Sequence, residues 1–265
     1  MGSRLAGKTA LVTGSTSNIG RAIALAFGAE GAHVVVSGRS QERGAAVVEE
    51  IRSAGGRADF VAADLDGSAE ASNRLARDAT QVLGGHVDIL VNNAGVFPAT
   101  TTATTDEATF DQVYAVNVKA PFFLTAAIAP AMAQRGAGAV INVGSWVARL
   151  GVPIASLYSS TKGAIETLTK AWAAEFGPAG VRVNTVSPGV IRSSTPGEAD
   201  DDPAGVMMLG TPAGQSGTSE AIAHAAVYLA SDEAAFLHGA VLDVDGGRLA
   251  VAVIAAPPTQ TTVSS

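Results

Sequence analysis

Tyr158 and Lys162 stand four residues apart in LYSSTKGAIETL, residues 157–168, a stretch with the composition of a helix. Residues four apart on a helix lie on the same face, one turn along. An ammonium about 4 Å from a phenol favours the phenolate by roughly 4 kcal/mol at an effective dielectric of about 20. This would bring the tyrosine pKa from about 10 to about 7. The pair therefore predicts a group that exchanges protons near neutral pH, although any long helix also offers such pairs by chance.

A glycine-containing loop, TGSTSNIGRAIA at 13–24, joins an apolar run to a helical pattern, which is the setting that a dinucleotide-binding loop requires. Gly14 allows a sharp turn, and Gly20 allows the helix to begin close to the strand. The helix N-terminus then offers unpaired N–H groups and a positive dipole end to a pyrophosphate. Asn18 stands where a further glycine would help, and asparagine adopts positive φ more readily than most residues. An ordinary tight turn between strand and helix is the alternative.

Short β-branched runs alternate with longer helical patterns along the chain. This alternation predicts βαβ units, and the near-continuous apolar runs indicate strands covered on both faces. We therefore predict an α/β fold, a single-domain Rossmann fold with a doubly wound seven-stranded parallel sheet and helices on both faces. The expected strands are 8–13, 33–37, 57–65, 87–93, 138–145, 181–189 and 240–247. The expected helices are 19–31, 40–56, 68–85, about 105–135 and 155–177.

One domain over 1–256 is the economical interpretation of the 265 residues, because no repeat and no Pro/Ser-rich linker divides them. The segment 193–217 is rich in Gly, Pro and Asp and carries an apolar centre, which favours a substrate lid. The last residues, PPTQTTVSS at 257–265, are expected to be a flexible tail.

The composition excludes several classes of protein. The chain is 47% hydrophobic with a net charge of −7 and no run of Lys or Arg, so we expect no nucleic-acid surface. It has no cysteine, and its four scattered histidines show no ligand spacing, so we expect no disulfide and no metal site. No apolar signal segment opens the chain, and LAVAVIAA at 249–256 is too short to span a bilayer. We expect a cytoplasmic protein that does not bind membranes.

Six features follow one another along the chain: the loop TGSTSNIG, the Asn92-Asn93-Ala94-Gly95 motif, Asn117, Ser145, the Tyr158 and Lys162 pair, and the Pro188-Gly189 turn. By their order and spacing the chain resembles the short-chain dehydrogenase/reductase family over nearly its whole length, and its 3-oxoacyl-ACP-reductase-like branch in particular. Ser145 precedes Tyr158 by thirteen residues, as the family's catalytic serine does. The sequence departs from the family pattern at two positions, and both changes are modest. Asn18 replaces the middle glycine of the loop, and Ser193 stands where the family often has a threonine.

The resemblance implies an oxidoreductase that interconverts a carbonyl and a secondary alcohol by hydride transfer. Tyr158 would be the general acid in reduction and the base in oxidation. Lys162 would lower its pKa and bind the nicotinamide ribose, and Ser145 would stabilise the substrate oxygen. Asn117 would hold a water in a proton relay. Its alternative role, a side chain bonded to backbone where a helix is interrupted, is compatible with the relay.

The end of the second strand favours NADP(H) over NAD(H). Gly38 stands where an NAD enzyme has a carboxylate, and the guanidinium of Arg39 suits a 2′-phosphate. Ser15, Ser17 and Ser37 could add hydroxyl contacts, but the glycine loop has Ser17 where a basic residue would support this preference. The alternative to a phosphate contact is that Arg39 simply begins the next helix and lies in solvent.

The family pattern implies a longer set of cofactor-binding residues, in which Asp64-Leu65 would meet the adenine, with Asp66 one residue along as an alternative. The set is Gly14, Ser15, Ser17, Asn18, Ile19, Gly20, Gly38, Arg39, Asp64, Leu65, Asn92, Ala94, Gly95, Tyr158, Lys162, Pro188, Gly189, Ile191 and Ser193.

The expected substrate pocket is apolar with an aromatic wall and favours a small hydrophobic carbonyl or alcohol. Asp200, Asp201 and Asp202 form a negative run in the lid, which we interpret as a solvated turn. At the pocket mouth this run would disfavour an acidic carrier protein. The expected lining is Val96, Phe97, Trp146, Val147, Val152 and the segment 193–209.

Two rival functions share this fold. A non-catalytic nicotinamide-binding sensor or scaffold would not require Ser145, Tyr158 and Lys162 together. An epimerase or dehydratase that reuses the nicotinamide usually belongs to longer chains. We also expect a homo-oligomer, a tetramer, formed through the two long helices and the C-terminal strand region, where the apolar stretch 249–256 would be buried.

Overall fold

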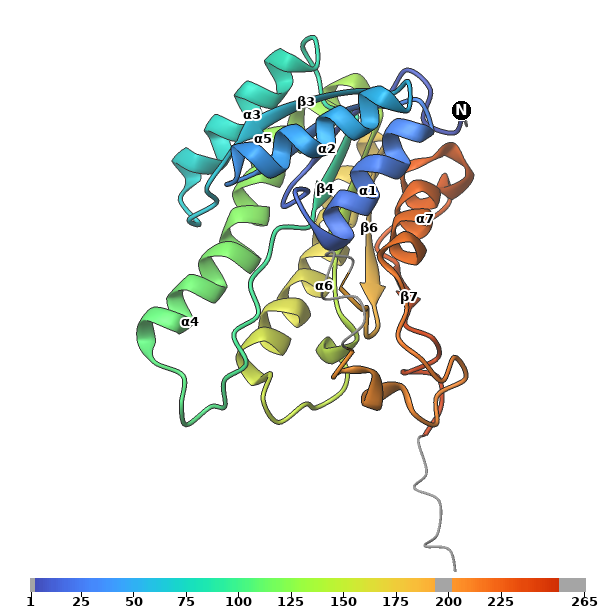
Figure 1. Cartoon of the computed structure of the whole chain (residues 1–265). Coiled ribbons are helices and arrows are strands. Elements are labelled where there is room, and N and C mark those ends of the chain that lie inside the picture. Colours follow the sequence, from blue (N-terminus) through green and yellow to red (C-terminus); the bar gives the residue numbers. More distant parts are fainter. Residues whose placement is uncertain (1–2, 194–201, 253–265) are drawn as a thin grey trace, which may run out of the picture.

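A computed structural model describes residues 3–193 and 202–252 of the chain. In these ranges seven strands form one sheet in the order β3-β2-β1-β4-β5-β6-β7 (Figure 1), and every pairing is parallel. The predicted doubly wound parallel sheet is therefore confirmed. The strands are β1 Thr9–Val12, β2 His33–Gly38, β3 Arg57–Ala62, β4 Ile89–Asn92, β5 Gly138–Val143, β6 Val181–Pro188 and β7 Val241–Val244.

Helices cover both faces of the sheet, as predicted. Side chains of Ser40, Ser68 and Asp106 cap α2, α3 and α4 by accepting backbone N–H bonds in the first turn. The α-helices are α1 Asn18–Ala29, α2 Gln41–Ser53, α3 Ala69–Val82, α4 Glu107–Tyr114, α5 Ala120–Arg135, α6 Ser156–Phe176 and α7 Ser219–Ala230. Short helical turns are η1 Ala115–Lys119, η2 Trp146–Ala148, η3 Gly177–Ala179, η4 Gly205–Met208 and η5 Asp232–Ala234.

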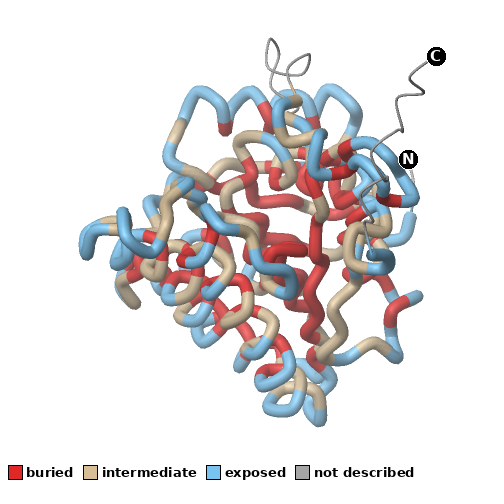
Figure 2. The backbone as a smooth tube through the Cα atoms, turned by 90° about the horizontal axis from the view of Figure 1, so that it is seen from below, coloured by how far each residue is buried: buried red, intermediate tan, exposed pale blue. Residues whose placement is uncertain are grey.

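The central strands are apolar on both faces because each face packs against a different helical layer. Val12 faces the layer of α1, α2 and α7, whereas Leu11 faces the layer of α3, α5 and α6. Leu11 is in register with Val35 on one side and Leu90 on the other, and these three residues share the second layer. Figure 2 shows the buried backbone gathered in the middle of the molecule, with exposed segments around it.

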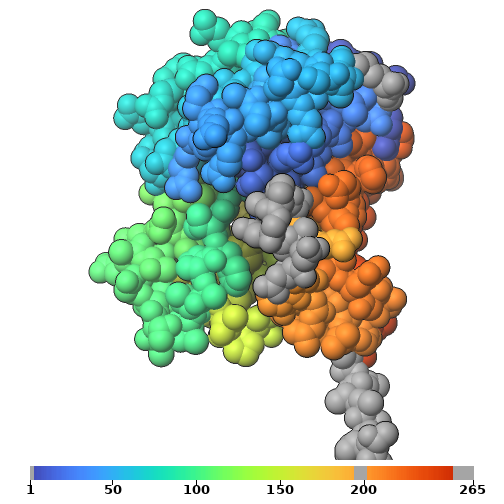
Figure 3. Space-filling model, in the orientation of Figure 1, coloured from blue at the N-terminus to red at the C-terminus, as the bar shows by residue number. Residues whose placement is uncertain are grey.

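The order of the strands reverses between β1 and β4. The chain runs outward from β1 through β2 to β3, then returns to add β4 on the other side of β1. Ligands of open α/β sheets bind in the crevice beyond the carboxyl ends of strands at such a switch point. Below this edge, the region of α4 and the region of η4 project on either side (Figures 1 and 3).

The expected helix at 105–135 is interrupted. It forms as α4, a π-helical turn η1 and α5, and the whole run Glu107–Arg135 is long and apolar enough to cross a membrane by length and composition alone. However, Leu124, Ile128 and Met132 of α5 are buried against the sheet. This burial is typical of a core helix, which passes the same test.

Three expectations concern segments that the structure describes in part or not at all. Residues 194–201 of the predicted lid at 193–217, with Asp200 and Asp201 among them, lie outside the described residues. The described remainder contains η4, whose Met208 is buried. The predicted tail at 257–265 lies wholly outside the described residues, as does the stretch from 253 onward. The single-domain boundaries at 1–256 therefore stay a prediction.

Candidate active site

The glycine loop places backbone where a side chain cannot fit. Gly14 has a φ of +61°, and a Cβ there would lie 2.8 Å from the Cα of Ala94. A Cβ on Gly20 would lie 2.4 Å from the carbonyl oxygen of Gly14. Asn18 has a φ of +45°, the one positive value at a non-glycine residue in the described ranges, as its residue type predicted. The side chain of Ser17 does not cap α1 within the described residues, and a helix N-terminus favours an anion.

The segment after β4 is tied to this loop by Asn93, which was missed as a site residue. Its Nδ2 donates to the carbonyl oxygens of Thr13 and Gly14, at 2.8 and 3.0 Å. Asn92 was predicted to bind the cofactor, but its side chain is buried and donates to Asn142 and Thr125 instead. Side chains alternate in direction along a strand, so adjacent residues at the strand end face different surroundings.

We expect Gly20→Ala to lower the affinity for NADPH and for NADH by at least about tenfold. The new methyl group would push apart Gly14 and Asn93, which shape the loop. A fluorescence titration with each dinucleotide measures the effect. Gly163→Ala is the control, because a Cβ at Gly163 meets nothing within 4 Å. Unchanged affinity in Gly20→Ala would mean that the loop does not contact the dinucleotide.

A cavity of about 670 Å³, here called the cofactor cleft, lies at the switch point beside the glycine loop. The predicted cofactor residues that line it are Gly14, Ser17, Asn18, Ile19, Gly20, Gly38, Arg39, Asp64, Leu65, Ala94, Gly95 and Tyr158. Lining residues that the sequence analysis did not assign to the cofactor are Thr16, Arg43, Ala63, Asn93, Gln112, Ala115 and Val116.

The remaining predicted cofactor residues do not line the cleft. Ser15 is a correction, because it is fully buried, donates to Val12 and accepts from the N–H of Ser37, so its hydroxyl fixes the turn. Lys162 lies buried behind Tyr158. The hydroxyl of Ser193 donates a hydrogen bond to the Oδ1 of Asn18 at 3.4 Å. The predicted residues at and after the end of β6 are Pro188, Gly189, Ile191 and Ser193. Their contact with a cofactor stays a prediction.

The end of β2 is crowded at Gly38, where an acidic side chain would require Thr16 to move. A Cβ on Gly38 would lie 2.8 Å from the Cγ2 of Thr16. Arg39 follows, and Arg43 in the first turn of α2 lines the same cleft. Neither guanidinium forms an ion pair within the described ranges. Arg43 of α2 is thus a second cation that lines the cleft, in addition to Arg39.

A hydrogen-bonded turn distinguishes Asp64 from Asp66 as the aspartate predicted to meet the adenine. All three of Asp64, Leu65 and Asp66 line the cleft. However, Asp66 accepts the N–H of Ser68 at 2.8 Å, and hydrogen bonds from Ser68 lower the pKa of Asp66 below its ordinary value. Asp66 therefore stabilises the turn before α3, which favours Asp64 and Leu65 as the pair that meets the adenine.

Three elements bring the predicted catalytic groups together. Ser145 follows β5 and caps η2, while Tyr158 and Lys162 occupy successive turns of α6. Ser145 lies close enough to Tyr158 to lower the pKa of its phenol. The Nζ of Lys162 lies 5.4 Å from the centroid of the Tyr158 ring and donates to the carbonyl oxygen of Val143 at 2.8 Å.

The predicted lowering of the Tyr158 pKa by Lys162 is not observed among the protein's own groups. Burial raises the pKa of Tyr158 to about 12, and the hydrogen bond from Ser145 offsets this only partly. Burial also lowers the pKa of Lys162 to about 8. Desolvation is the largest cause of both changes, because burial disfavours the charged phenolate and the charged ammonium alike.

Asn117 lies in the π-helical turn η1 and is buried. Its Oδ1 accepts the N–H of Val96 at 2.8 Å, and its Nδ2 donates to the carbonyl oxygen of Val96 at 2.9 Å and to Thr161 at 3.2 Å. The side chain therefore anchors the segment after β4 to α6 at a helix interruption. Its predicted part in a proton relay stays a prediction.

The predicted substrate residues lie on two sides of Tyr158. Phe97 is half exposed, and its ring centroid lies 4.8 Å from that of Tyr158. Trp146 and Val147 are buried in an apolar cluster with Val152 and Tyr158. Val96 lines the cofactor cleft rather than this cluster. Leu249 also joins the cluster and was missed, since it lies far along the chain.

Comparison with known proteins agrees with this geometry. Residues 8–204 match the family model for short chain dehydrogenase. Galactitol 2-dehydrogenase of Cereibacter sphaeroides is 39% identical over 92% of this chain and 96% of its own. A solved short chain dehydrogenase/reductase family protein is 43% identical, with a TM-score of 0.84 over 94% of this chain and 100% of its own. A 3-oxoacyl (acyl-carrier-protein) reductase from Agrobacterium tumefaciens, solved with NADP bound, is 32% identical, with a TM-score of 0.86 over 92% and 95% of the two chains.

Proposed function

The chain belongs to the short chain dehydrogenase family of nicotinamide-dependent oxidoreductases, and on that premise we propose that it interconverts a carbonyl and a secondary alcohol with NADP(H). The observation that carries the proposal is the convergence of Ser145, Tyr158 and Lys162 beside the cofactor cleft. The residues present fit the cofactor. The close approach of Gly20 to Gly14 exposes the N-terminus of α1 to a pyrophosphate.

A bound nicotinamide supplies or accepts the hydride. Ser145 hydrogen-bonds the substrate oxygen and stabilises the negative charge that develops on it. Tyr158 then donates its phenolic proton to that oxygen. A phenol with a pKa of about 12 can do so, because an alkoxide is a far stronger base than a phenolate. Oxidation requires Tyr158 to be deprotonated first, so the protein's own groups favour its role as an acid.

The preference for NADP(H) is supported by two arginines at one end of the cleft. A guanidinium suits a phosphate by its charge and its fork of donors. Arg39 and Arg43 line the cleft beyond β2, where Gly38 excludes the carboxylate that would select NAD(H). The NADP-bound relative described above is consistent with this preference.

The double variant Arg39→Ala and Arg43→Ala is expected to weaken NADPH binding by about 10²- to 10⁴-fold, because each of the two charged hydrogen bonds is worth about 1.5–3 kcal/mol. NADH, which lacks the 2′-phosphate, should change less than threefold. Parallel fluorescence titrations provide the measurement, and Arg77→Ala on the exposed face of α3 is the control. An equal loss for both dinucleotides would show that the arginines do not read the phosphate.

The direct test of function is an absorbance assay that follows NADPH consumption with a panel of ketones. Steady oxidation of NADPH that depends on the ketone supports the proposal. Tight NADPH binding without turnover of any member would favour the sensor or scaffold. A substrate converted without net change in NADPH absorbance would instead indicate an epimerase or dehydratase.

The proposed setting is a cytoplasmic homotetramer that acts on a small substrate with an apolar body and binds neither nucleic acid nor membranes. Support for assembly comes from apolar side chains that a folded monomer leaves exposed. Phe110 on α4 and Phe122 on α5 are about half exposed, and Phe236 after η5 is fully exposed. Light scattering tests the assembly, and a mass near the 26.4 kDa of one chain would overturn it.

A further inference from the structure

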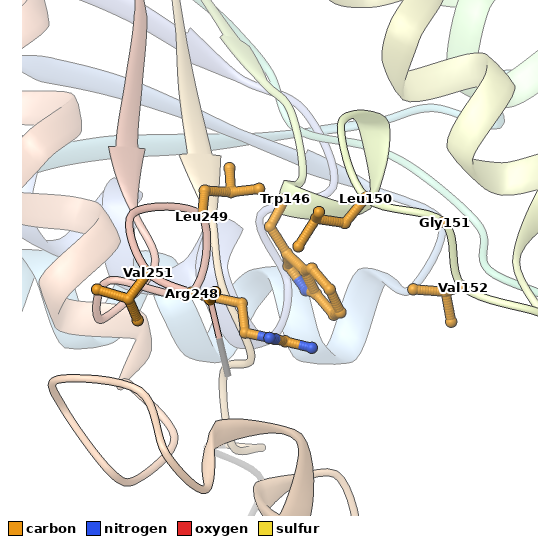
Figure 4. A pocket seen from close by; sticks show the side chains of 8 residues that line it. Trp146, Leu150, Gly151, Val152, Arg248, Leu249 and Val251 are labelled. Carbon is orange, nitrogen blue, oxygen red and sulfur yellow. The ribbon is translucent and has the colours of Figure 1, made fainter. Parts of the chain in front are cut away.

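A second cavity, of about 340 Å³ and here called the Arg248 pocket, adjoins the substrate region (Figure 4). Trp146 forms one of its walls and directly follows Ser145 in the sequence. The remaining walls are mostly aliphatic, with Leu150, Val152 and Leu249 among them. Arg248 is the one charged residue of the lining. The pocket thus extends the apolar substrate region toward a single positive charge.

The guanidinium of Arg248 is held in place but not neutralised. It lies 5.0 Å from the centroid of the Trp146 ring, and Figure 4 shows the two side chains next to each other in the pocket. A cation over an aromatic face is attracted to it but keeps its hydrogen-bond donors. The Nε of Arg248 is buried without a hydrogen-bond partner, and Arg248 forms no ion pair in the part of the chain that the structure describes.

The loop that carries Arg248 is built to hold it. Asp245, at the end of β7, is buried, and its carboxylate accepts the N–H groups of Gly247 at 2.8 Å and Leu249 at 2.9 Å. Gly247 has a φ of +82°, which allows the tight turn. The nearest carboxylate in the sequence is therefore used to fix the backbone on both sides of Arg248 and does not pair with its guanidinium.

A neighbouring arginine shows the contrast. Arg149 follows η2, forms an ion pair with Glu166 at 3.3 Å, and donates to both carboxylate oxygens of Asp243. It thereby ties the loop after β5 to α6 and β7, the elements beside the Arg248 pocket. Arg149 thus pairs with structural partners, whereas Arg248 lines a cavity and forms no ion pair within the described residues. A partly buried polar group without a partner is costly, and a ligand of opposite charge would remove that cost.

We propose that Arg248 binds a carboxylate of the substrate, so that the enzyme acts on an oxo acid or hydroxy acid rather than on a neutral ketone. This inference rests on the proposed function. The substrate oxygen would bind at Ser145 and Tyr158, the apolar body would pack on Trp146, and the carboxylate would meet the guanidinium fork. A single cation with aliphatic walls matches one negative charge, whereas a dianionic phosphate would leave charge uncompensated.

The test compares oxo acids with their methyl esters, which have the same ketone without the charge. The probes are acetoacetate, 4-oxopentanoate and 5-oxohexanoate, each with its methyl ester and NADPH. We expect at least one acid to exceed its ester tenfold in kcat/KM. Arg248→Gln should lower kcat/KM for that acid by 10- to 100-fold, chiefly through KM, and change the ester less than threefold. Arg248→Lys should retain part of the acid preference, and Arg77→Gln should change neither.

Several outcomes would overturn the inference. Equal rates for acids and esters in the wild type, or equal losses in Arg248→Gln, would exclude a carboxylate contact at Arg248. Turnover of esters and other neutral ketones would still support the proposed function, so the two failures are distinguishable. Thermal unfolding of each variant checks that the loop still folds.

A binding measurement keeps the inference testable without turnover. Hexanoate added to the protein with NADP⁺ should change the fluorescence of Trp146, and Arg248→Gln should raise the dissociation constant at least tenfold. Hexanoate binding that does not differ between the wild type and Arg248→Gln would overturn the inference. Tighter binding of butyl phosphate than of hexanoate would also overturn it, because the pocket would then be a phosphate site.

Discussion

Tyr158→Phe is expected to lower kcat for ketone reduction by about 10²- to 10⁴-fold, the contribution typical of general acid catalysis. The substitution removes one hydroxyl from a ring that lines the cofactor cleft and leaves the ring in contact with Phe97. The substrate oxygen would keep its hydrogen bond to Ser145 but lose its proton donor. NADPH affinity should therefore change less than threefold.

Stopped-flow measurement of NADPH oxidation in single turnover separates this chemical step from product release. Tyr114→Phe is the matched control, because its hydroxyl hydrogen-bonds Ser160 on the outside of the molecule. If Tyr158→Phe kept the wild-type rate in single turnover, another group would be the acid. If the wild type itself gave no turnover while both proteins bound NADPH, the sensor or scaffold would be the better explanation.

The repeating pattern of the chain was sufficient to predict the fold, because strand and helix periodicities depend on neighbouring residues. Leu11 and Val12 face different helical layers, as an apolar run in a doubly covered sheet must. The glycine loop was equally accessible, since the positive φ of Asn18 and the crowding at Gly20 are local properties.

Side-chain direction at strand ends could not be predicted in the same way. Ser15 and Asn92 belong to the expected motifs, yet both are buried and hydrogen-bonded within the protein, and Asn93 takes the place beside the glycine loop. A strand that ends one residue earlier or later reverses which side chain faces the crevice. Motif spacing alone does not fix that end.

Residues distant in sequence were the other source of error. Arg43 reaches the cofactor cleft from α2, and Arg248 reaches the substrate region from the loop after β7. The opposite pKa changes of Tyr158 and Lys162 have the same origin, because their burial depends on elements on both sides of α6. Sequence spacing gives the distance between two charges but not how much water surrounds them.

Lys162→Met is expected to abolish most of the activity and yet to stabilise the fold at pH 7. Burial lowers the pKa of Lys162 from 10.5 to about 8, a difference that corresponds to about 3 kcal/mol of unfolding free energy. The substitution also removes the hydrogen bond to Val143, which costs about 1–2 kcal/mol. A net gain of about 1–2 kcal/mol remains, because methionine fills a similar volume without a charge.

The pH dependence of this gain identifies its cause. The folded protein binds the Lys162 proton less tightly than the unfolded chain does, so the penalty is complete below about pH 8. It shrinks as the pH rises from 8 to 10.5 and is absent above that range, where both states hold neutral lysine.

Urea unfolding at pH 7 and pH 10 measures the effect, and Lys170→Met, at an exposed position of α6, is the control. A gain that does not shrink with rising pH would mean that improved packing, and not removal of a buried charge, stabilises the variant. A loss of stability at pH 7 would mean that the surroundings of Lys162 favour its ammonium, so that its burial does not destabilise the fold.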